Sequence, residues 1–387
     1  MLVTTLAWAA LVSAAIPAAM FLRNLGRFLP PPEVPIRELT HSADDSGDTT
    51  DQRQAVSLLI PARDEAAGIA ASVAAALASR GVEIEVVVLD DHSVDATAAI
   101  VDEIAARDRR VRRIAGEALP EGWNGKQFAC YQLAAAARYD RFAFIDADVR
   151  LQPDALVRLV AYQDTVDVAL LSAFPKQLTG SWLECWLIPL MHFILLGFLP
   201  IDRMRASRLP AYAAGCGQLF LTRRPDYDAA GTHRAIRGSR HDGLKLPAAY
   251  RAAGLATDVV DGTPIASCRM YQRAGEVIRG LLKNATEGIA SPRLIVPFTT
   301  ILLGGACLPW ITLLAAVGTA QWLAAVIATL AIAISYLPRV LAAARFDQSW
   351  LGVVFHPAAL TLFVALQWIA LVNRSLGRQV AWRGRTE

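Results

Sequence analysis

The sequence is poor in charge: Asp, Glu, Lys and Arg make up only 19% of its 387 residues, whereas hydrophobic residues make up 54%. An average soluble domain carries about 25% charged residues, so this chain is too apolar for an ordinary soluble protein. The shortage is local, because residues 1–22, 295–338 and 351–372 contain no charged side chain. We therefore expect a globular domain that is attached to a bilayer at both ends.

Three further absences narrow the possible functions. The five cysteines form no CxxC pair, which argues against a disulfide framework or a zinc site and fits a reducing compartment. No block of Lys and Arg interleaves with aromatic residues, so we expect no nucleic-acid partner. No GxGxxG follows the first predicted strand and no P-loop motif is present, which disfavours a dinucleotide site and a P-loop.

The N-terminal apolar run, residues 1–22, predicts an uncleaved transmembrane anchor. No basic residue precedes it, and Arg23 and Arg27 follow it, so the positive-inside rule predicts an external N-terminus and a cytoplasmic main domain. The polar, proline-bearing residues 23–54 predict a linker. We therefore expect a multi-pass protein of the cell (inner) membrane whose main domain, residues 55–290, is cytoplasmic.

Residues 291–373 predict a C-terminal transmembrane region of two to three spans, followed by a basic tail, 374–387. Leu294–Val317 and Gln321–Leu337 are typical of a helical hairpin, and Leu351–Val372 of a further span. Three spans would place the tail outside, whereas its four arginines favour the cytoplasm, so the number of spans stays open.

A further apolar segment, Trp182–Pro200, lies within the main domain. It is interrupted by Glu184, Pro189 and His192, which makes it a poor transmembrane span. Its two tryptophans favour a helix that lies at the bilayer surface, and a buried core helix is the alternative.

The main domain alternates apolar strand-like runs with helical segments. Such an order predicts an α/β fold with a mostly parallel sheet that is covered on both faces. In such sheets ligands bind beyond the carboxyl ends of the strands. Asp90 and Asp91 end one predicted strand, Asp146 and Asp148 end another, and the segment 61–65 follows the first strand. We expect these groups along one edge of the sheet.

Asp146 and Asp148 are separated by one residue, so they point the same way if the strand conformation persists. Two like charges on one face repel each other unless a cation offsets them. Mg²⁺ or Mn²⁺, held by one or two carboxylates together with a diphosphate, satisfies this requirement. The alternative is that the two aspartates form a solvated strand end.

The motifs, taken in order, resemble the GT-A fold of family 2 inverting glycosyltransferases. The flanking apolar spans, GWNGK and RMY (269–271) make the chain most similar to the membrane-bound branch associated with hopanoid and carotenoid glycosylation. The segments that carry the resemblance are LLIPARDE (58–65), VVVLDDHSVDAT (86–97), GWNGKQFA (122–129), FIDADV (144–149), AAGCGQLFLTRR (213–224) and HDGLKLPAAYRAAG (241–254).

The resemblance implies a nucleotide pocket that is lined by Pro61, Arg63 and Glu65. It also implies that Asp91 accepts a hydrogen bond from a uracil ring and that Asp90 supports it. Both groups lie in the segments that follow the first two predicted strands.

The resemblance further implies the residues around the reacting groups. Lys126 would lie near the nucleotide or diphosphate, and Asp146 would contact the ribose or the sugar. Asp148 would coordinate the metal, and Asp242 would act as the general base. Gly215 and Gly217 would shape the acceptor side, where the absent side chains let the backbone approach the sugar.

Two departures from the family pattern affect this interpretation. His241 stands where the family usually has an acidic residue, so it would orient Asp242 or lower its pKa. The QxxRW motif of processive members is absent, which favours a single transfer. The segment in its place offers diphosphate or acceptor contacts at Arg269, Tyr271, Arg273 and Arg279.

Together these patterns predict an enzyme that transfers a sugar, with inversion, from a UDP-sugar to a lipid acceptor of isoprenoid, hopanoid or carotenoid type. The transfer would need Mg²⁺ or Mn²⁺ and would occur at the cytoplasmic leaflet. The alternatives are a polysaccharide-type sugar transferase, a nucleotidyltransferase, and a non-catalytic membrane scaffold with a GT-A-like domain.

Overall fold

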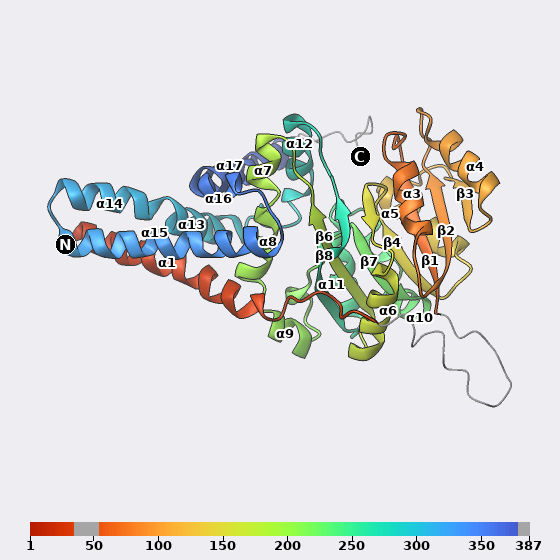
Figure 1. Cartoon of the computed structure of the whole chain (residues 1–387). Helices are drawn as coiled ribbons and strands as arrows, with labels where there is room; N and C mark the ends of the chain where they lie inside the picture. Colours follow the sequence, from red (N-terminus) through yellow and green to blue (C-terminus); the bar gives the residue numbers. More distant parts are fainter. Residues whose placement is uncertain (35–53, 378–387) are drawn as a thin grey trace, which may run out of the picture. The chain divides into compact units, whose positions relative to one another are not determined.

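The computed structural model describes residues 1–34 and 54–377, which fold into two compact units (Figure 1). The sheet unit comprises Leu29–Lys176 and Asp202–Arg269. The helical unit comprises Met1–Phe28, Gln177–Ile201 and the residues from Met270 onward. Most of the expected linker and of the expected basic tail lies outside the described residues. The expected main domain, 55–290, includes two segments that the structure assigns to the helical unit.

The helical unit contains the apolar helices expected from the sequence. Three of them, α1, α15 and α17, are long and apolar enough to cross a membrane, and α13 and α14 together form a fourth such segment with a 46° bend. That these helices cross a membrane, and which of their ends face the cytoplasm, stay predictions. The helices are α1 (Leu2–Leu25), α7 (Trp182–Leu187), α8 (Leu190–Phe198), α12 (Ala274–Ala285), α13 (Ile295–Ala306), α14 (Leu308–Gly318), α15 (Trp322–Arg345), α16 (Leu351–Val354) and α17 (His356–Ser375).

The hairpin expected near Gly318 is present, because α14 ends at Gly318 and α15 begins at Trp322. Helices α1, α14 and α15 lie side by side, and alanines such as Ala7 and Ala328 let their backbones approach closely (Figure 1). The sequence did not indicate the bend at Cys307 between α13 and α14.

The apolar segment Trp182–Pro200 forms two short helices, α7 and α8, which are separated at Ile188 and Pro189. Its inner side is buried against α12, α13 and α17, as Leu187 and Phe193 illustrate. Trp182 remains 56% exposed. Most of the segment is therefore packed within the helical unit, and its contact with a bilayer surface stays a prediction.

The sheet unit has one sheet of eight strands in the order β3-β2-β1-β4-β7-β6-β8-β5. Strands β3, β2, β1 and β4 pair in parallel, and β7 is antiparallel to both β4 and β6, so β6 runs in the direction of β4. This arrangement confirms the expected α/β fold with a mostly parallel sheet. The strands are β1 (Ala55–Ala62), β2 (Glu83–Asp90), β3 (Val111–Ala115), β4 (Arg141–Ile145), β5 (Val149–Leu151), β6 (Leu170–Gln177), β7 (Leu219–Arg223) and β8 (Thr257–Cys268).

Both faces of the sheet are buried, and for this reason the strand sequences are nearly continuous apolar runs. The core includes Leu59 of β1, Val87 of β2 and Phe144 of β4, and helices α5 and α11 contribute to it. The helices of the unit are α3 (Ile69–Leu77), α4 (Thr97–Arg107), α5 (Gly125–Ala136), α6 (Ala155–Val166), α9 (Ile201–Ala206), α10 (Arg224–Ala229) and α11 (Asp242–Ala252).

The strand register places the predicted site segments at one edge of the sheet. Ala62 of β1 pairs with Asp90 of β2, and Leu59 of β1 pairs with Phe144 of β4. The carboxyl ends of these three neighbouring strands therefore lie together, as expected for the acidic residues that follow them.

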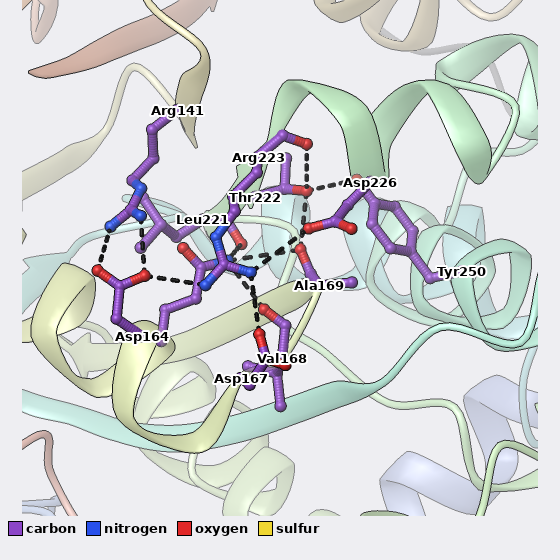
Figure 2. A network of polar contacts seen from close by, with 11 residues as sticks. Arg141, Asp164, Asp167, Val168, Ala169, Leu221, Thr222, Arg223, Asp226 and Tyr250 are labelled. Carbon is purple, nitrogen blue, oxygen red and sulfur yellow. Dashed lines mark hydrogen bonds and ion pairs between the residues drawn. The ribbon is translucent and has the colours of Figure 1, made fainter.

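A polar network secures the antiparallel β4/β7 pair (Figure 2). Arg141 and Arg223 lie directly opposite each other, which would be unfavourable for two like charges. Asp164 of α6 accepts hydrogen bonds from both guanidinium groups, at 2.8 Å from Arg141 Nη2 and 2.9 Å from Arg223 Nη2. Nearby, the Thr222 hydroxyl lies 2.8 Å from Ala169 O and from the Tyr250 hydroxyl.

Candidate active site

Lys126 lies at the centre of a cluster of predicted site residues. Its Nζ is 2.5 Å from Asp146 Oδ1 and 2.8 Å from Asp242 Oδ2, and it donates to Gly217 O at 3.2 Å. The four residues come from the start of α5, the end of β4, the start of α11 and the segment before β7. Residues far apart in sequence thus form one polar centre.

The local fold positions Lys126 through the residue two places before it. Asn124 caps α5, and its side-chain Oδ1 accepts a hydrogen bond from the backbone N–H of Lys126. The backbone N–H of Asn124 donates to Arg237 O at 2.6 Å. This bond ties the start of α5 to the segment that leads into α11, so Lys126 and Asp242 are held near each other.

Gly217 lies against the Asp242 carboxylate. A Cβ atom at position 217 would be 2.1 Å from Asp242 Oδ1, which is far inside van der Waals contact. The backbone N–H of Gly243 donates to the same Oδ1 at 2.8 Å. Only glycine at position 217 leaves room for the Asp242 carboxylate. The side chain that is missing at this position therefore makes room for the predicted base.

The charges in this centre shift its ionisation. Burial would raise the pKa of Asp242, but the charge and hydrogen bond of Lys126, with help from His241, hold that pKa below its ordinary value. Burial raises the pKa of Asp146, and the neighbouring Asp148 and Asp242 charges act in the same direction, against Lys126. The Lys126 charge therefore keeps Asp242 ionised at neutral pH.

Asp148 offers a buried oxygen that no protein group engages. Its Oδ1 is buried and has no hydrogen-bond partner among the described residues. Val149, the residue after Asp148, pairs with Cys268 of β8, and Gln218 Nε2 donates to Cys268 Sγ at 3.0 Å. The backbone of Gln218 also accepts from Asp146 N–H at 3.1 Å. These contacts tie the segment of both aspartates to β8 and to the residue before β7.

The carboxylates around Lys126 supply only some of the ligands that a divalent cation needs. Within residues 1–34 and 54–377, no three His, Cys, Asp or Glu side chains are arranged to hold a metal. The unpartnered Asp148 oxygen and the excess of carboxylates over Lys126 suit a cation that takes its remaining ligands from a diphosphate or water. The alternative of a solvated strand end does not describe this geometry, because Asp146 is paired and Asp148 Oδ1 is buried.

The nucleotide-side residues form a second group after β1 and β2. Arg63 Nη1 donates to Asp91 O at 2.9 Å and lies 3.7 Å from Asp91 Oδ2. Asp90 Oδ1 accepts from the backbone N–H of Ser93 at 3.3 Å. The Glu65 backbone N–H donates to Thr97 Oγ1 at 2.8 Å. The loops after the two strands are therefore interlocked.

Pro61 and the remaining predicted residues lie in the same unit. Pro61 is the second-last residue of β1 and pairs with Leu89 of β2. Gly215 precedes β7, where a Cβ would meet the Phe220 ring at 2.8 Å. His241 caps α11. Of the candidates that replace QxxRW, Arg269 belongs to the sheet unit, and Tyr271, Arg273 and Arg279 belong to the helical unit.

Arg150 connects the two groups of site residues and was not singled out from the sequence. Its Nη1 donates to Ala147 O at 3.1 Å and to Val149 O at 2.9 Å, and its Nη2 donates to Gly68 O at 2.8 Å. It therefore joins the turn that carries Asp148 to the loop after β1. Asn124, Gln218 and Cys268 were also missed, and only Asn124 carried a signal, since Asn is a preferred helix cap.

Part of the chain is similar to a known protein family. Residues 57–228 match the family described as Glycosyl transferase family 2. This segment includes both aspartate groups and Lys126, whereas Asp242 lies beyond it.

Curated relatives carry the name 4,4'-diaponeurosporenoate glycosyltransferase. The protein of Staphylococcus aureus (strain MRSA252) is 29% identical over 256 residues, which cover 65% of this chain and 66% of that protein. The protein of strain USA300 is 28% identical over 264 residues, with the same coverage. The match therefore spans just under two thirds of the length of these relatives.

The fold comparison agrees with the family. A solved mannosyltransferase from Pyrobaculum calidifontis, in complex with GDP-Man and Mn²⁺, superimposes with a TM-score of 0.50 at 17% identity. The alignment covers 96% of this chain and 98% of that protein. This similarity confirms the GT-A-like fold.

Proposed function

We propose that this glycosyltransferase transfers a sugar, with inversion, from a UDP-sugar to a lipid acceptor, once per acceptor molecule. The observation that carries the proposal is the contact of Lys126 with both Asp146 and Asp242. One carboxylate follows a central strand at the ligand-binding edge of the sheet, and the other begins α11. A single centre thus combines a base with groups suited to a charged leaving group.

Asp242 is the general base of this proposal. Its low pKa keeps it ionised at neutral pH, so it is ready to accept a proton from the acceptor hydroxyl. The acceptor oxygen bonds to the anomeric carbon as the bond from that carbon to the diphosphate oxygen breaks. The proton passes to Asp242, and the bonding pair leaves with the nucleoside diphosphate.

Lys126 tunes this base. In the structure its ammonium group is shared by two carboxylates, which weakens Asp242 as a base. An incoming diphosphate competes with those carboxylates for the ammonium group. Because the loss of the Lys126 contact raises the pKa of Asp242, donor binding strengthens the base when it is needed.

Asp148 is the proposed ligand of a divalent cation, Mg²⁺ or Mn²⁺. Support comes from its unpartnered, buried Oδ1 and from the excess of negative charge around Lys126. When bound, such an ion neutralises the charge that develops on the leaving diphosphate. The Cys268 and Gln218 contacts keep the segment of Asp148 in place for this role.

The donor site is proposed at the ends of β1 and β2. Asp91 would accept a hydrogen bond from uracil with the support of Asp90, and Arg63, Pro61 and Glu65 would line the pocket. The interlocked loops favour a rigid nucleotide site, which lowers the entropy lost on binding. Because the solved mannosyltransferase was in complex with GDP-Man, a GDP-sugar is the competing donor to test.

The lipid acceptor is proposed from two observations. The staphylococcal relatives are named for a carotenoid acid, and the chain has at least three helices that are apolar enough to span a membrane. Gly215, Gly217 and His241 would form the acceptor side next to Asp242. The proposed location is the inner membrane, with the catalytic domain in the cytoplasm.

The experiment supplies labelled donors to membranes that contain the full chain. UDP-glucose, UDP-galactose, UDP-N-acetylglucosamine and GDP-mannose are incubated separately with Mn²⁺, and the products are divided into lipid extract, polymer and nucleotide fractions. We expect a UDP-sugar to label the lipid extract. Label in a polymer would favour a polysaccharide-type transferase, consumption of a sugar phosphate and nucleotide would favour a nucleotidyltransferase, and no label in any fraction would favour a scaffold.

A further inference from the structure

Arg339 is a buried cation inside the helical unit. It lies on α15, one of the helices apolar enough to span a membrane, and its exposed fraction is 0%. Its Nη1 donates to Pro189 O at 2.8 Å, whereas Nε and Nη2 have no hydrogen-bond partner within residues 1–34 and 54–377. No carboxylate in the described part of the chain forms an ion pair with it.

Other buried polar atoms gather around this guanidinium group. Gln348 Nε2 lies 3.0 Å from His192 Nδ1. Among the residues that the structure describes, Gln348 Oε1 and His356 Nδ1 have no partner. Both imidazoles lie near enough to Arg339 for its charge to act on them. His356 and Ser335 line a cavity of about 10 Å³, which is near the size of a single water molecule. The polar groups therefore outnumber the protein partners available to them.

The backbone around Arg339 is broken rather than continuously helical. Pro189 lies at the break between α7 and α8, and Gly352 lies in the short helix α16, before the break to α17. A Cβ at position 352 would be 2.4 Å from Cys185 O and 2.9 Å from Arg339 Nη2, so only glycine lets α16 approach α7 and this nitrogen so closely. Broken helices inside membrane proteins are found where the chain lines a cavity or a binding site.

An unpaired guanidinium group in such surroundings is strongly unfavourable. Each buried donor without a partner costs about 1–3 kcal/mol, and an unpaired charge in an apolar bundle costs more. Arginines in membrane-spanning segments normally pair with an anion or face a polar cavity. The missing partner of Arg339 is therefore an anion.

We propose that Arg339 binds an oxyanion, a carboxylate or a phosphate, inside the helical unit. Its two unpartnered nitrogens, Nε and Nη2, share one edge of the guanidinium plane, which is the edge that holds two oxygens of one group. His356 and Gln348 supply further polar contacts. The oxyanion comes from the headgroup of an anionic lipid or from the free ion.

The test compares the full wild-type chain with Arg339→Met in a neutral detergent. If nothing binds, the loss of a buried unpaired charge should leave the thermal unfolding midpoint unchanged or raise it. We expect the opposite: the midpoint of Arg339→Met is lower when lipid or phosphate is present. A midpoint equal to or above that of the wild type under these conditions would overturn the proposal.

Two titrations identify the source of the oxyanion. One adds sodium phosphate at constant ionic strength, and the other adds mixed micelles of phosphatidylglycerol, with phosphatidylcholine micelles as the neutral comparison. A saturable rise of the wild-type midpoint in the first assigns a free ion, and a rise only in the second assigns a lipid headgroup. No rise in either titration contradicts the proposal.

Two variants keep the result interpretable. Arg345→Met removes an exposed charge from the end of the same helix, so it should keep the full rise. Arg339→Lys keeps the buried charge but loses the two-nitrogen edge, so it should fold and need at least about tenfold more ligand for half of the rise. Wild-type affinity in Arg339→Lys, or loss of the rise in Arg345→Met, would point to general charge attraction instead.

Discussion

Lys126 Nζ lies 2.8 Å from Asp242 Oδ2, and this ion pair joins the start of α5 to the start of α11. The same nitrogen lies 2.5 Å from Asp146 Oδ1. One cation is thus shared between a strand-end carboxylate and the proposed base. The ionisation of Asp242, and with it the chemistry proposed for the site, depends on that shared contact.

The first prediction concerns the pH dependence of activity in Lys126→Met. In the wild type the lowered pKa of Asp242 keeps this carboxylate ionised even at pH values below the ordinary aspartate pKa, so its titration falls below the range of a standard assay. Without Lys126, burial dominates and raises that pKa. We expect the acid limb of log kcat/KM to move up by about one pH unit or more.

The measurement is the pH–rate profile between pH 5 and 9 at saturating Mn²⁺. Lys245→Met, which removes an exposed charge from α11, is the control and should keep the wild-type profile. Parallel profiles for Lys126→Met and the wild type would show that Lys126 does not tune Asp242.

The second prediction concerns the metal. Chelation should abolish transfer, and Mn²⁺ or Mg²⁺ should restore it. Asp148→Asn should raise the Mn²⁺ concentration for half-maximal activity by at least about tenfold, because it removes the charged oxygen that has no other partner. Asp228→Asn, at an exposed carboxylate on α10, should leave the titration unchanged. An unchanged Mn²⁺ titration in Asp148→Asn would exclude it as the ligand.

The third prediction uses the contact of Gly217 with Asp242. In Gly217→Ala the new Cβ would collide with the carboxylate, so the base must move and kcat should fall at least about tenfold. The free energy of unfolding should decrease by about 1–3 kcal/mol. In Gly238→Ala the nearest atom to the new Cβ is Gly122 O at an ordinary 3.5 Å, so both quantities should stay close to wild type. Equal kcat values for both variants would contradict the proposed position of the base.

The fourth prediction concerns stability away from the site. Asp164→Asn removes the charge that offsets Arg141 and Arg223 across the β4/β7 pair. Because Asp164 is partly exposed, we expect the free energy of unfolding to fall by only about 1 kcal/mol or less. Urea unfolding of the variant measures this change, and activity per folded molecule should be retained. A loss of activity without loss of stability would assign Asp164 an unexpected role in catalysis.

Much of the sheet unit could be predicted because its strands are short, continuous apolar runs. The segment AVSLLIPA corresponds residue for residue to β1, and the register of β1 with β2 and β4 brings the acidic residues to one edge. The antiparallel position of β7 between β4 and β6 could not be predicted, because it depends on pairing between distant segments rather than on local pattern.

The first residue of a helix was harder to predict where the side chains before the helix form hydrogen bonds with a different loop. Serine is a preferred helix cap, but Ser93 does not cap the helix that follows β2, because α4 begins at Thr97, with Ala96 as its cap residue. The Ser93 hydroxyl instead accepts from the backbone N–H of Asp64, and Asp95 Oδ1 accepts from Thr97 N–H. Contacts with the loop after β1 thus replace the local cap, and Asp91 does not cap this helix either.

The contacts between the predicted site residues could not be predicted from the sequence. Lys126 lies at the start of α5, where a cation is unfavourable beside the positive end of the helix dipole. In the structure Asp146 and Asp242 offset its charge, and no local pattern could show that two distant carboxylates meet there. Arg150, Gln218 and Cys268 were missed for the same reason, since their roles depend on tertiary contacts.

The most direct measurement of the central claim follows donor binding and sugar transfer in the same preparation of Asp242→Asn. Asn keeps the shape of the side chain but cannot accept the proton. The account predicts donor affinity within about threefold of wild type and transfer reduced by at least about 100-fold. Transfer at the wild-type rate in this variant would contradict the assignment of Asp242 as the base and, with it, the proposed mechanism.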